Sequence, residues 1–89
     1  AIARIYQAVK EGVAGLLMNP AGFTYAGFAL RDCIKAVSLP YVEVHMTNIE
    51  RRGTRSVLAE VANGVVTGLG ISSYLLGLDG LLNAIEHEL

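Results

Sequence analysis

The sequence predicts an α/β fold built on a parallel sheet. Three short apolar segments, at residues 13–18, 41–46 and 64–69, alternate with segments in which apolar residues recur at helical spacing. Strands that alternate with helices favour parallel pairing through right-handed crossovers. The apolar share of 53% exceeds the globular average, and the first two segments lack the alternation of a half-exposed strand. We therefore expect strands that are buried on both faces.

The first two elements are predicted to be a helix and a strand. Apolar residues recur at helical spacing until Gly12 ends the pattern, namely at Ile2, Ile5, Tyr6 and Val9. The apolar run 13–18 follows and stops at Asn19-Pro20-Ala21-Gly22, a sequence typical of a loop. These patterns predict an amphipathic helix and then a buried strand.

A second helix and a second strand are expected next. Helical spacing between residues 26 and 37 predicts a helix that closes before Pro40, and the strand 41–46 follows it. Residues 47–56 are polar and carry arginines, which is typical of a functional loop and too short for a domain linker. Residues 57–62 are expected to form a short helical turn.

The chain is predicted to close with a strand at 64–69 and a helix at 70–88. That helix should turn one apolar face inward, formed by Ile71, Leu75, Leu78, Leu82 and Ile85. A chain of 89 residues forms one domain at most, with a burial of about 60 to 65%, near the lower limit for folding alone. The helical pattern that opens at Ala1, without an initiator methionine, indicates a fragment. We therefore expect residues 1–89 to form a single partial domain that needs partners.

Charge and cysteine content argue against several classes of protein. A net charge of −1 provides no global field for nucleic acid or for an anionic membrane. Apolar runs fall short of the roughly 18 residues of a membrane span, and the amino end has no secretory signal pattern. The single cysteine, Cys33, excludes a disulfide framework, and metal-ligand spacing is absent. We expect a cytoplasmic protein without nucleic-acid, membrane or metal partners.

Glu43 and His45 are the main candidates for chemistry. Two residues apart on a strand, they share one face near its carboxyl end, where ligands bind in open α/β sheets. A carboxylate beside an imidazole fixes its tautomer and raises its basicity, which suits general acid–base catalysis. A buried structural ion pair, or the exposed face of an edge strand, explains the same spacing about equally well.

Polar residues that follow the strands are candidates for binding. Asn19 ends the neighbouring strand, so its amide can point into the same crevice, although a turn role for Asn-Pro is more common. Met46, Thr47 and Asn48 leave their strand with free backbone N–H groups, which suit a carboxylate. Charge is added nearby by Arg51, Arg52 and Arg55. A solvated loop is the alternative interpretation.

Four blocks of the sequence resemble, in order, the signature blocks of type II 3-dehydroquinate dehydratases, the type II dehydroquinases, over nearly the whole chain. They are Asn19-Pro20-Ala21-Gly22-Phe23-Thr24, Ala29-Leu30-Arg31-Asp32, Pro40-Tyr41-Val42-Glu43-Val44-His45-Met46-Thr47-Asn48-Ile49 and Gly64-Val65-Val66-Thr67-Gly68-Leu69-Gly70. The resemblance implies a flavodoxin-like three-layer fold with a parallel sheet. This chain would supply strands three to five of the usual five, with their flanking helices.

The resemblance also implies a reaction and a set of roles. The activity would be that of a lyase of the shikimate or quinate pathway, which dehydrates 3-dehydroquinate to 3-dehydroshikimate by anti elimination through an enolate, without a cofactor. His45 would be the general acid that protonates the departing C1 hydroxyl, with Glu43 orienting it and Asn19 near that hydroxyl. Thr47 and the backbone around Met46 would hold the substrate carboxylate.

The family is a dodecamer built from trimers, so the resemblance implies a homo-oligomer as well. Asp32 would reach across a subunit boundary into a neighbouring site. Such an assembly agrees with the surplus of apolar residues in this chain.

Three departures from the family pattern bear on activity. Tyr25 stands where the family usually has histidine, and a phenol cannot become cationic near neutral pH. The arginine loop is shortened, so that Arg52 falls on the family's first arginine and Arg55 is the best candidate for the second, which binds substrate. The family's catalytic tyrosine and its activating arginine, on a lid after the first strand, are absent from these residues. This fragment is therefore expected to be inactive alone.

Two alternative functions remain open at this point. The chain can belong to a dehydroquinase-like paralogue with an altered substrate or without activity, or to a non-catalytic flavodoxin-like module kept for assembly.

Overall fold

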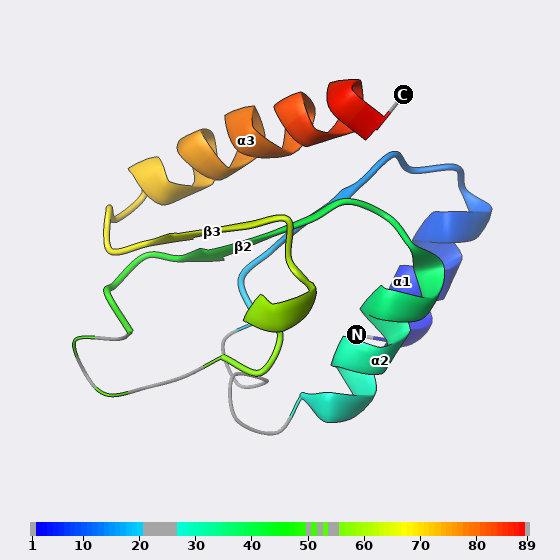
Figure 1. Cartoon of the computed structure of the whole chain (residues 1–89), viewed down its shortest axis with the longest axis horizontal. Coiled ribbons are helices and arrows are strands. Elements are labelled where there is room, and N and C mark those ends of the chain that lie inside the picture. The colour runs from blue at the N-terminus through cyan, green and yellow to red at the C-terminus, as the bar shows by residue number, and fades with distance from the viewer. Residues whose placement is uncertain (1, 21–26, 50, 52, 54–55, 89) are drawn as a thin grey trace.

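The computed structural model describes residues 2–20, 27–49, 51, 53 and 56–88, and within them a three-stranded parallel sheet lies between helices (Figure 1). The strands are β1 (Leu16–Met18), β2 (Tyr41–His45) and β3 (Gly64–Thr67), paired in that order. The prediction of an α/β fold with a parallel sheet is confirmed.

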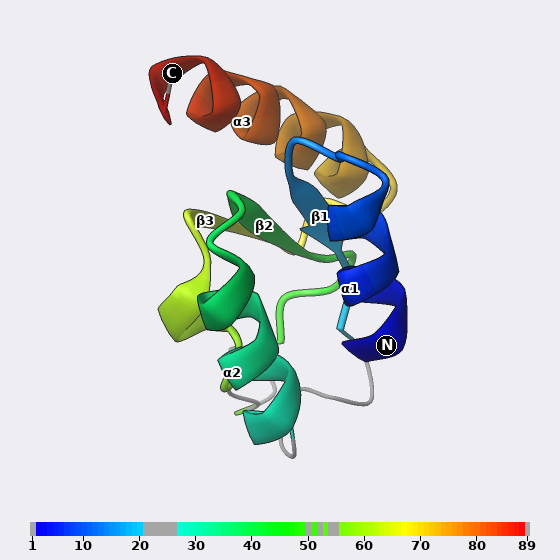
Figure 2. The same ribbon diagram turned by 90° about the vertical axis from the view of Figure 1, so that its right-hand side faces the viewer.

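Helices cover both faces of this sheet. Helices α1 (Ile2–Lys10) and α2 (Phe28–Val37) lie on one face, and α3 (Ser72–Glu88) lies on the other (Figure 2). A short 3₁₀ helix, η3 (Ala59–Val61), precedes β3. The predicted order of elements is therefore observed, including the turn within residues 57–62.

Two hydrophobic clusters form the core, one on each face of the sheet. The cluster beneath α1 and α2 contains Ile5, Leu30, Cys33, Ile34, Tyr41 and Leu58. The cluster beneath α3 contains Val42, Val44 and Leu81. Because successive strand residues point to opposite faces, β2 contributes to both clusters, and all five of its residues are buried. The central strand is covered on both faces, as expected, whereas all three residues of β1 are only half-buried, contrary to the expectation for that strand.

The strands are shorter than the apolar runs that predicted them. β1 starts at Leu16 because its register pairs Leu16 with Tyr41, the first residue of β2, so earlier residues have no partner in the ladder. β2 ends at His45. β3 ends at Thr67, since Gly68 follows with a φ of 90°, in the left-handed region that interrupts a strand.

The predicted inward face of α3 is wrong at every position except Ile85. Ile71, Leu75, Leu78 and Leu82 are 74%, 68%, 42% and 52% exposed. The helix instead turns Ser73, Gly77 and Leu81 to the sheet, and Ser73 and Leu81 are buried. A Cβ at Gly77 would lie only 2.7 Å from Val44 Cγ2. The small residues of the helix therefore face the sheet. A prediction based on large apolar side chains does not detect them.

Within residues 2–20, 27–49 and 56–88, no helix is long and apolar enough to cross a membrane.

Candidate active site

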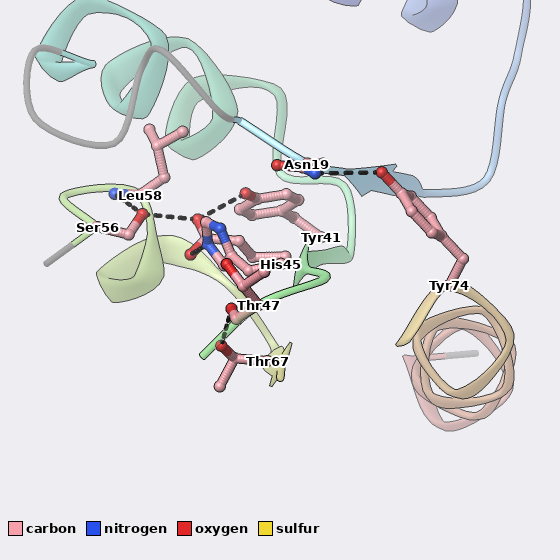
Figure 3. A network of polar contacts seen from close by, with 9 residues as sticks. Asn19, Tyr41, His45, Thr47, Ser56, Leu58, Thr67 and Tyr74 are labelled. Atoms are coloured by element: carbon pink, nitrogen blue, oxygen red, sulfur yellow. Dashed lines mark hydrogen bonds and ion pairs between the residues drawn. The ribbon is translucent and has the colours of Figure 1, made fainter. Parts of the chain in front are cut away.

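Candidate functional residues gather where the three strands end. Asn19 follows β1, His45 closes β2 and Thr67 closes β3. The sheet register sets these ends side by side, with Met18 opposite Glu43 and His45 opposite Thr67. Figure 3 shows Asn19, His45 and Thr67, with dashed lines that join Asn19 to Tyr74 and Thr67 to Thr47. The carboxyl edge of the sheet therefore carries the candidate site, as predicted.

Glu43 and His45 form a buried pair on one face of β2. His45 Nε2 lies 2.7 Å from Glu43 Oε2, and the two residues are 4% and 0% exposed. Strand alternation places both on the face that packs against α1 and α2. When Nε2 donates to the ionised carboxylate, Nδ1 is the ring nitrogen that remains for a reacting group. The exposed-edge interpretation of this pair is therefore wrong, because β2 is the buried central strand.

The second carboxylate oxygen of Glu43 accepts two more hydrogen bonds. Tyr41 Oη donates to Oε1 at 2.9 Å, and Ser56 Oγ donates to the same oxygen at 2.8 Å. The Ser56 hydroxyl accepts the backbone N–H of Leu58 at 3.2 Å, which fixes the direction of its own proton. Three donors thus surround a carboxylate that lies out of water.

Tyr41 keeps its proton under these conditions. Burial raises the pKa of the Tyr41 phenol far above its ordinary value of 10.0, and the negative charge of Glu43 and the hydrogen bond to it add to the shift. The phenol is therefore a hydrogen-bond donor, and not a base, across the physiological range.

Asn19 lies at the same edge of the sheet, and its amide is directed to α3. Asn19 Nδ2 donates to Tyr74 Oη at 3.2 Å (Figure 3). This bond ties the end of β1 to the first turns of α3. Asn19 thus lies at the carboxyl end of its strand, where it was predicted, and its side chain connects that end to α3.

Backbone hydrogen bonds hold the loop after β2. Gly68 N–H donates to the His45 carbonyl at 3.0 Å, and Gly70 N–H donates to the Met46 carbonyl at 2.9 Å. Thr67 Oγ1 donates to the Thr47 carbonyl at 3.0 Å. Met46 and Thr47 are exposed, so the start of this loop is both anchored and open to solvent.

The remaining predicted residues are separate from this cluster or outside the described part. Asp32 is exposed on α2, whose buried face carries Leu30, Cys33 and Ile34. Three predicted binding residues lie outside the described residues: Tyr25, Arg52 and Arg55. A search of the described His, Cys, Asp and Glu side chains finds no group of three that could hold a metal ion.

A hollow on the α1/α2 side belongs to the opposite end of the sheet. Its volume is about 540 Å³, and its lining includes Pro40 and Asn63, which precede β2 and β3. None of the candidate site residues that the structure describes lines it.

Sequence reasoning missed several of the contacting residues. Tyr41 shares its strand face with Glu43 and His45, and this alternation was a usable signal. Ser56 reaches Glu43 across 13 positions of sequence, and Tyr74 reaches Asn19 across 55. Local spacing carries no information on contacts of that range.

The arrangement suits proton transfer. An imidazole held by a buried carboxylate, at a sheet edge with exposed loop residues beside it, has the geometry of a general acid or base. The neighbouring hydroxyl and amide groups can supply hydrogen bonds to oxygen atoms of a small polar ligand.

Comparisons with known proteins agree with one another. Residues 1–82 match the family model described as dehydroquinase class II. The 3-dehydroquinate dehydratase of Ectopseudomonas mendocina is 45% identical over 87 residues, which cover 94% of this chain and 59% of that protein. The 3-dehydroquinate dehydratase of Halothermothrix orenii is 46% identical over 79 residues, which cover 85% of this chain and 53% of that protein.

The fold of this chain resembles a solved structure of the same kind. The crystal structure of the type II dehydroquinase from Butyrivibrio crossotus gives a TM-score of 0.83 at 34% sequence identity. The match covers 91% of this chain and 59% of that one. The chain thus spans less than two thirds of the length of these relatives.

Proposed function

Because the chain belongs to the class II dehydroquinase family, we propose that the protein containing it dehydrates 3-dehydroquinate to 3-dehydroshikimate. The observation that carries this proposal is the buried pair of Glu43 and His45, 2.7 Å apart at the carboxyl end of β2. The pair lies within the longest block that resembles the family. The reaction belongs to the shikimate or quinate pathway, in the cytoplasm.

The reaction divides between this chain and residues outside it. A tyrosine on a lid, activated by an arginine, removes the C2 proton of the substrate and leaves an enolate. His45, oriented by Glu43, then protonates the departing C1 hydroxyl, so that water is lost and a double bond forms between C1 and C2. The fixed carboxylate supports this role, because it holds the imidazole in one orientation.

Binding roles are assigned to residues around the pair. Thr47 and the backbone at Met46 hold the substrate carboxylate, which their exposure beside His45 supports. Asn19 binds near the C1 hydroxyl. Further contacts to substrate come from Tyr25, Arg52 and Arg55.

The finer architecture is part of the proposal. β1, β2 and β3 correspond to strands three to five of a flavodoxin-like three-layer fold with five strands. Two observations support this. β1 is an edge strand of the described sheet. At α3 an apolar stripe is exposed, formed by Ile71, Leu75, Leu78 and Leu82. The edge of β1 can pair with a further strand, and an exposed apolar stripe is unusual for a complete domain.

The assembly is proposed to be a dodecamer built from trimers. Asp32, exposed on α2, contributes to the site of a neighbouring subunit. The exposed apolar surface is consistent with a chain that is covered by partners.

The test is the turnover of the full-length protein with His45 replaced by Ala. Loss of a general acid should lower kcat by about 10²- to 10⁴-fold. Turnover is measured by the absorbance of the conjugated product. His87→Ala is the matched control, because His87 is exposed on α3 and contacts the Asn83 carbonyl of its own helix. Undiminished turnover in His45→Ala would remove His45 from the mechanism.

Tyr25 favours a second candidate, a paralogue with an altered substrate preference. Tyrosine at a position where the family usually has histidine changes the charge available to a substrate oxygen. Tyr25→His in the full-length protein should then raise turnover of 3-dehydroquinate by tenfold or more. A change of less than twofold contradicts this candidate, and absence of both binding and turnover favours a non-catalytic assembly module.

A further inference from the structure

Glu43 is held by three side chains of the described residues. Its Oε2 faces His45 Nε2 at 2.7 Å, and its Oε1 accepts from Tyr41 Oη at 2.9 Å and from Ser56 Oγ at 2.8 Å. Glu43 and Tyr41 are both 0% exposed. Each carboxylate oxygen therefore has a fixed partner, and rotation of the carboxylate would break contacts on both sides.

The two hydroxyl donors come from separate parts of the chain. Tyr41 opens β2, on the same face as Glu43. Ser56 lies beyond the loop that follows β2, and it accepts the Leu58 N–H while it donates to Glu43. Because each hydroxyl has one proton, both protons are committed to the carboxylate. Hydrogen bonds of this kind to a charged acceptor are stronger than those between neutral groups.

Packing and hydrogen bonding are separable at Tyr41. Its ring belongs to the cluster beneath α1 and α2, with Leu30 and Ile34 among its members. Its hydroxyl is directed to Glu43. A phenylalanine at this position keeps the ring in the core and removes only the donor.

The geometry points to Tyr41 and Ser56 as positioning residues that act on His45 through Glu43. They hold one carboxylate oxygen so that the other sets the orientation of the imidazole. Neither residue is required to touch the substrate. This inference rests on the proposed function in one respect, that His45 transfers the proton.

The kinetic test uses the full-length protein with Tyr41→Phe and Ser56→Ala, singly and together. Each single variant should lower kcat by about tenfold and leave KM within about twofold, because the reacting geometry changes and substrate binding does not. The double variant should lose less than the product of the two, since both donors serve one oxygen. Ser56→Thr keeps the hydroxyl and should restore kcat.

Tyr6→Phe is the matched control for Tyr41→Phe. Tyr6 lies on α1 and is 47% exposed, whereas Glu43 is 0% exposed. It should leave kcat and KM unchanged. A fall in kcat in Tyr6→Phe equal to that in Tyr41→Phe overturns the inference.

A spectroscopic measurement separates this inference from the proposed function. The imidazole N–H resonance of His45, assigned by its absence in His45→Gln, should shift in Tyr41→Phe and in Ser56→Ala, and should not shift in Tyr6→Phe. An unshifted resonance overturns the positioning role, whatever the activity. A shifted resonance with unchanged kcat supports the positioning role and contradicts proton transfer by His45.

Discussion

A carboxylate at position 43 is costly for folding, because β2 is buried along its whole length. His45, Tyr41 and Ser56 offset that cost by donating hydrogen bonds to both of its oxygens. The same bonds fix the direction of the imidazole. Stability and the proposed proton transfer therefore depend on one set of contacts, and a change at any of the four residues affects both.

Tyr41 makes the stability of the protein sensitive to alkaline pH. Its folded-state pKa is raised by burial, by the charge of Glu43 and by their hydrogen bond, whereas in the unfolded chain it ionises near 10.0. Its contribution is complete below pH 10 and is lost as the pH rises beyond that value, because only the unfolded chain releases the proton.

We expect the unfolding free energy to fall by about 1.4 kcal/mol per pH unit above pH 10 on account of Tyr41. Tyr41→Phe removes this component, whereas Tyr6→Phe retains it. Chemical denaturation between pH 9 and 11, with tyrosinate absorbance as a second probe, measures the difference in the full-length protein. Equal pH dependence in the parent and in Tyr41→Phe would contradict the raised pKa.

Sequence spacing predicted part of the site at the scale of residues. Two-residue alternation on a strand brought Glu43 and His45 together, and the structure has them in contact. The same rule applies to Tyr41, but spacing does not tell whether a hydroxyl reaches a carboxylate. Ser56 and Tyr74 come from distant positions, so their contacts depend on the path of the whole chain.

At the scale of elements, the order of helices and strands followed from local patterns, and the orientation of α3 did not. Apolar residues occur over half of the helix circumference, so periodicity leaves a choice of which stripe faces the sheet. Steric fit decides it: Ser73 and Gly77 allow close approach to β2, and Leu81 fills the space beyond. A hydrophobic stripe predicts the buried face of a helix only when the opposite face is polar.

Gly77 is predicted to be intolerant of a side chain. In Gly77→Ala the new Cβ would lie 2.7 Å from Val44 Cγ2 and 3.0 Å from Leu17 Cδ1, so the helix or the strands must shift. Overpacking of a core costs about 1 to 3 kcal/mol, which exceeds the gain of up to about 1 kcal/mol in helix propensity. We expect a lower unfolding midpoint in denaturant.

Gly80→Ala is the control on the same helix. A Cβ at Gly80 meets nothing within 4 Å, so the substitution should stabilise the protein by about 0.5 to 1 kcal/mol. A lower unfolding free energy in Gly77→Ala together with a higher one in Gly80→Ala would support the close approach of α3 to the sheet. Stabilisation by both substitutions would show that α3 lies farther from β2.

At the scale of the whole molecule, an edge of the described sheet and the exposed apolar stripe of α3 lie on the same side. β1 forms that edge. Tyr74 contacts the end of β1 through Asn19, and a Cβ at Gly15 would lie 3.1 Å from Ile85 Cδ1. Leu78 is four residues after Tyr74 and seven before Ile85, so helical geometry puts it on that flank too. The apolar stripe of α3 therefore borders the outer edge of β1 in the described sheet.

The position of this stripe predicts that the same pair of substitutions has opposite effects in the isolated chain and in the full-length protein. In the isolated chain of 89 residues, Leu78→Gln and Leu82→Gln remove exposed apolar area, because the two residues are 42% and 52% exposed. Self-association, followed by light scattering and by binding of a hydrophobic dye, should decrease. In the full-length protein, where we propose that further strands and helices cover this flank, the same pair should lower stability by about 2 to 4 kcal/mol.

Substitution of Asn83, an exposed polar residue of α3, provides the reference. Asn83→Gln should leave the self-association of the isolated chain unchanged. It should also leave the unfolding free energy of the full-length protein within about 0.5 kcal/mol of the parent. If the leucine substitutions leave the full-length protein equally stable, the flank faces solvent there as well. The five-strand arrangement would then lose the support that the exposed stripe gives it, because a sheet extended beyond β1 requires a helical layer that continues beyond α3.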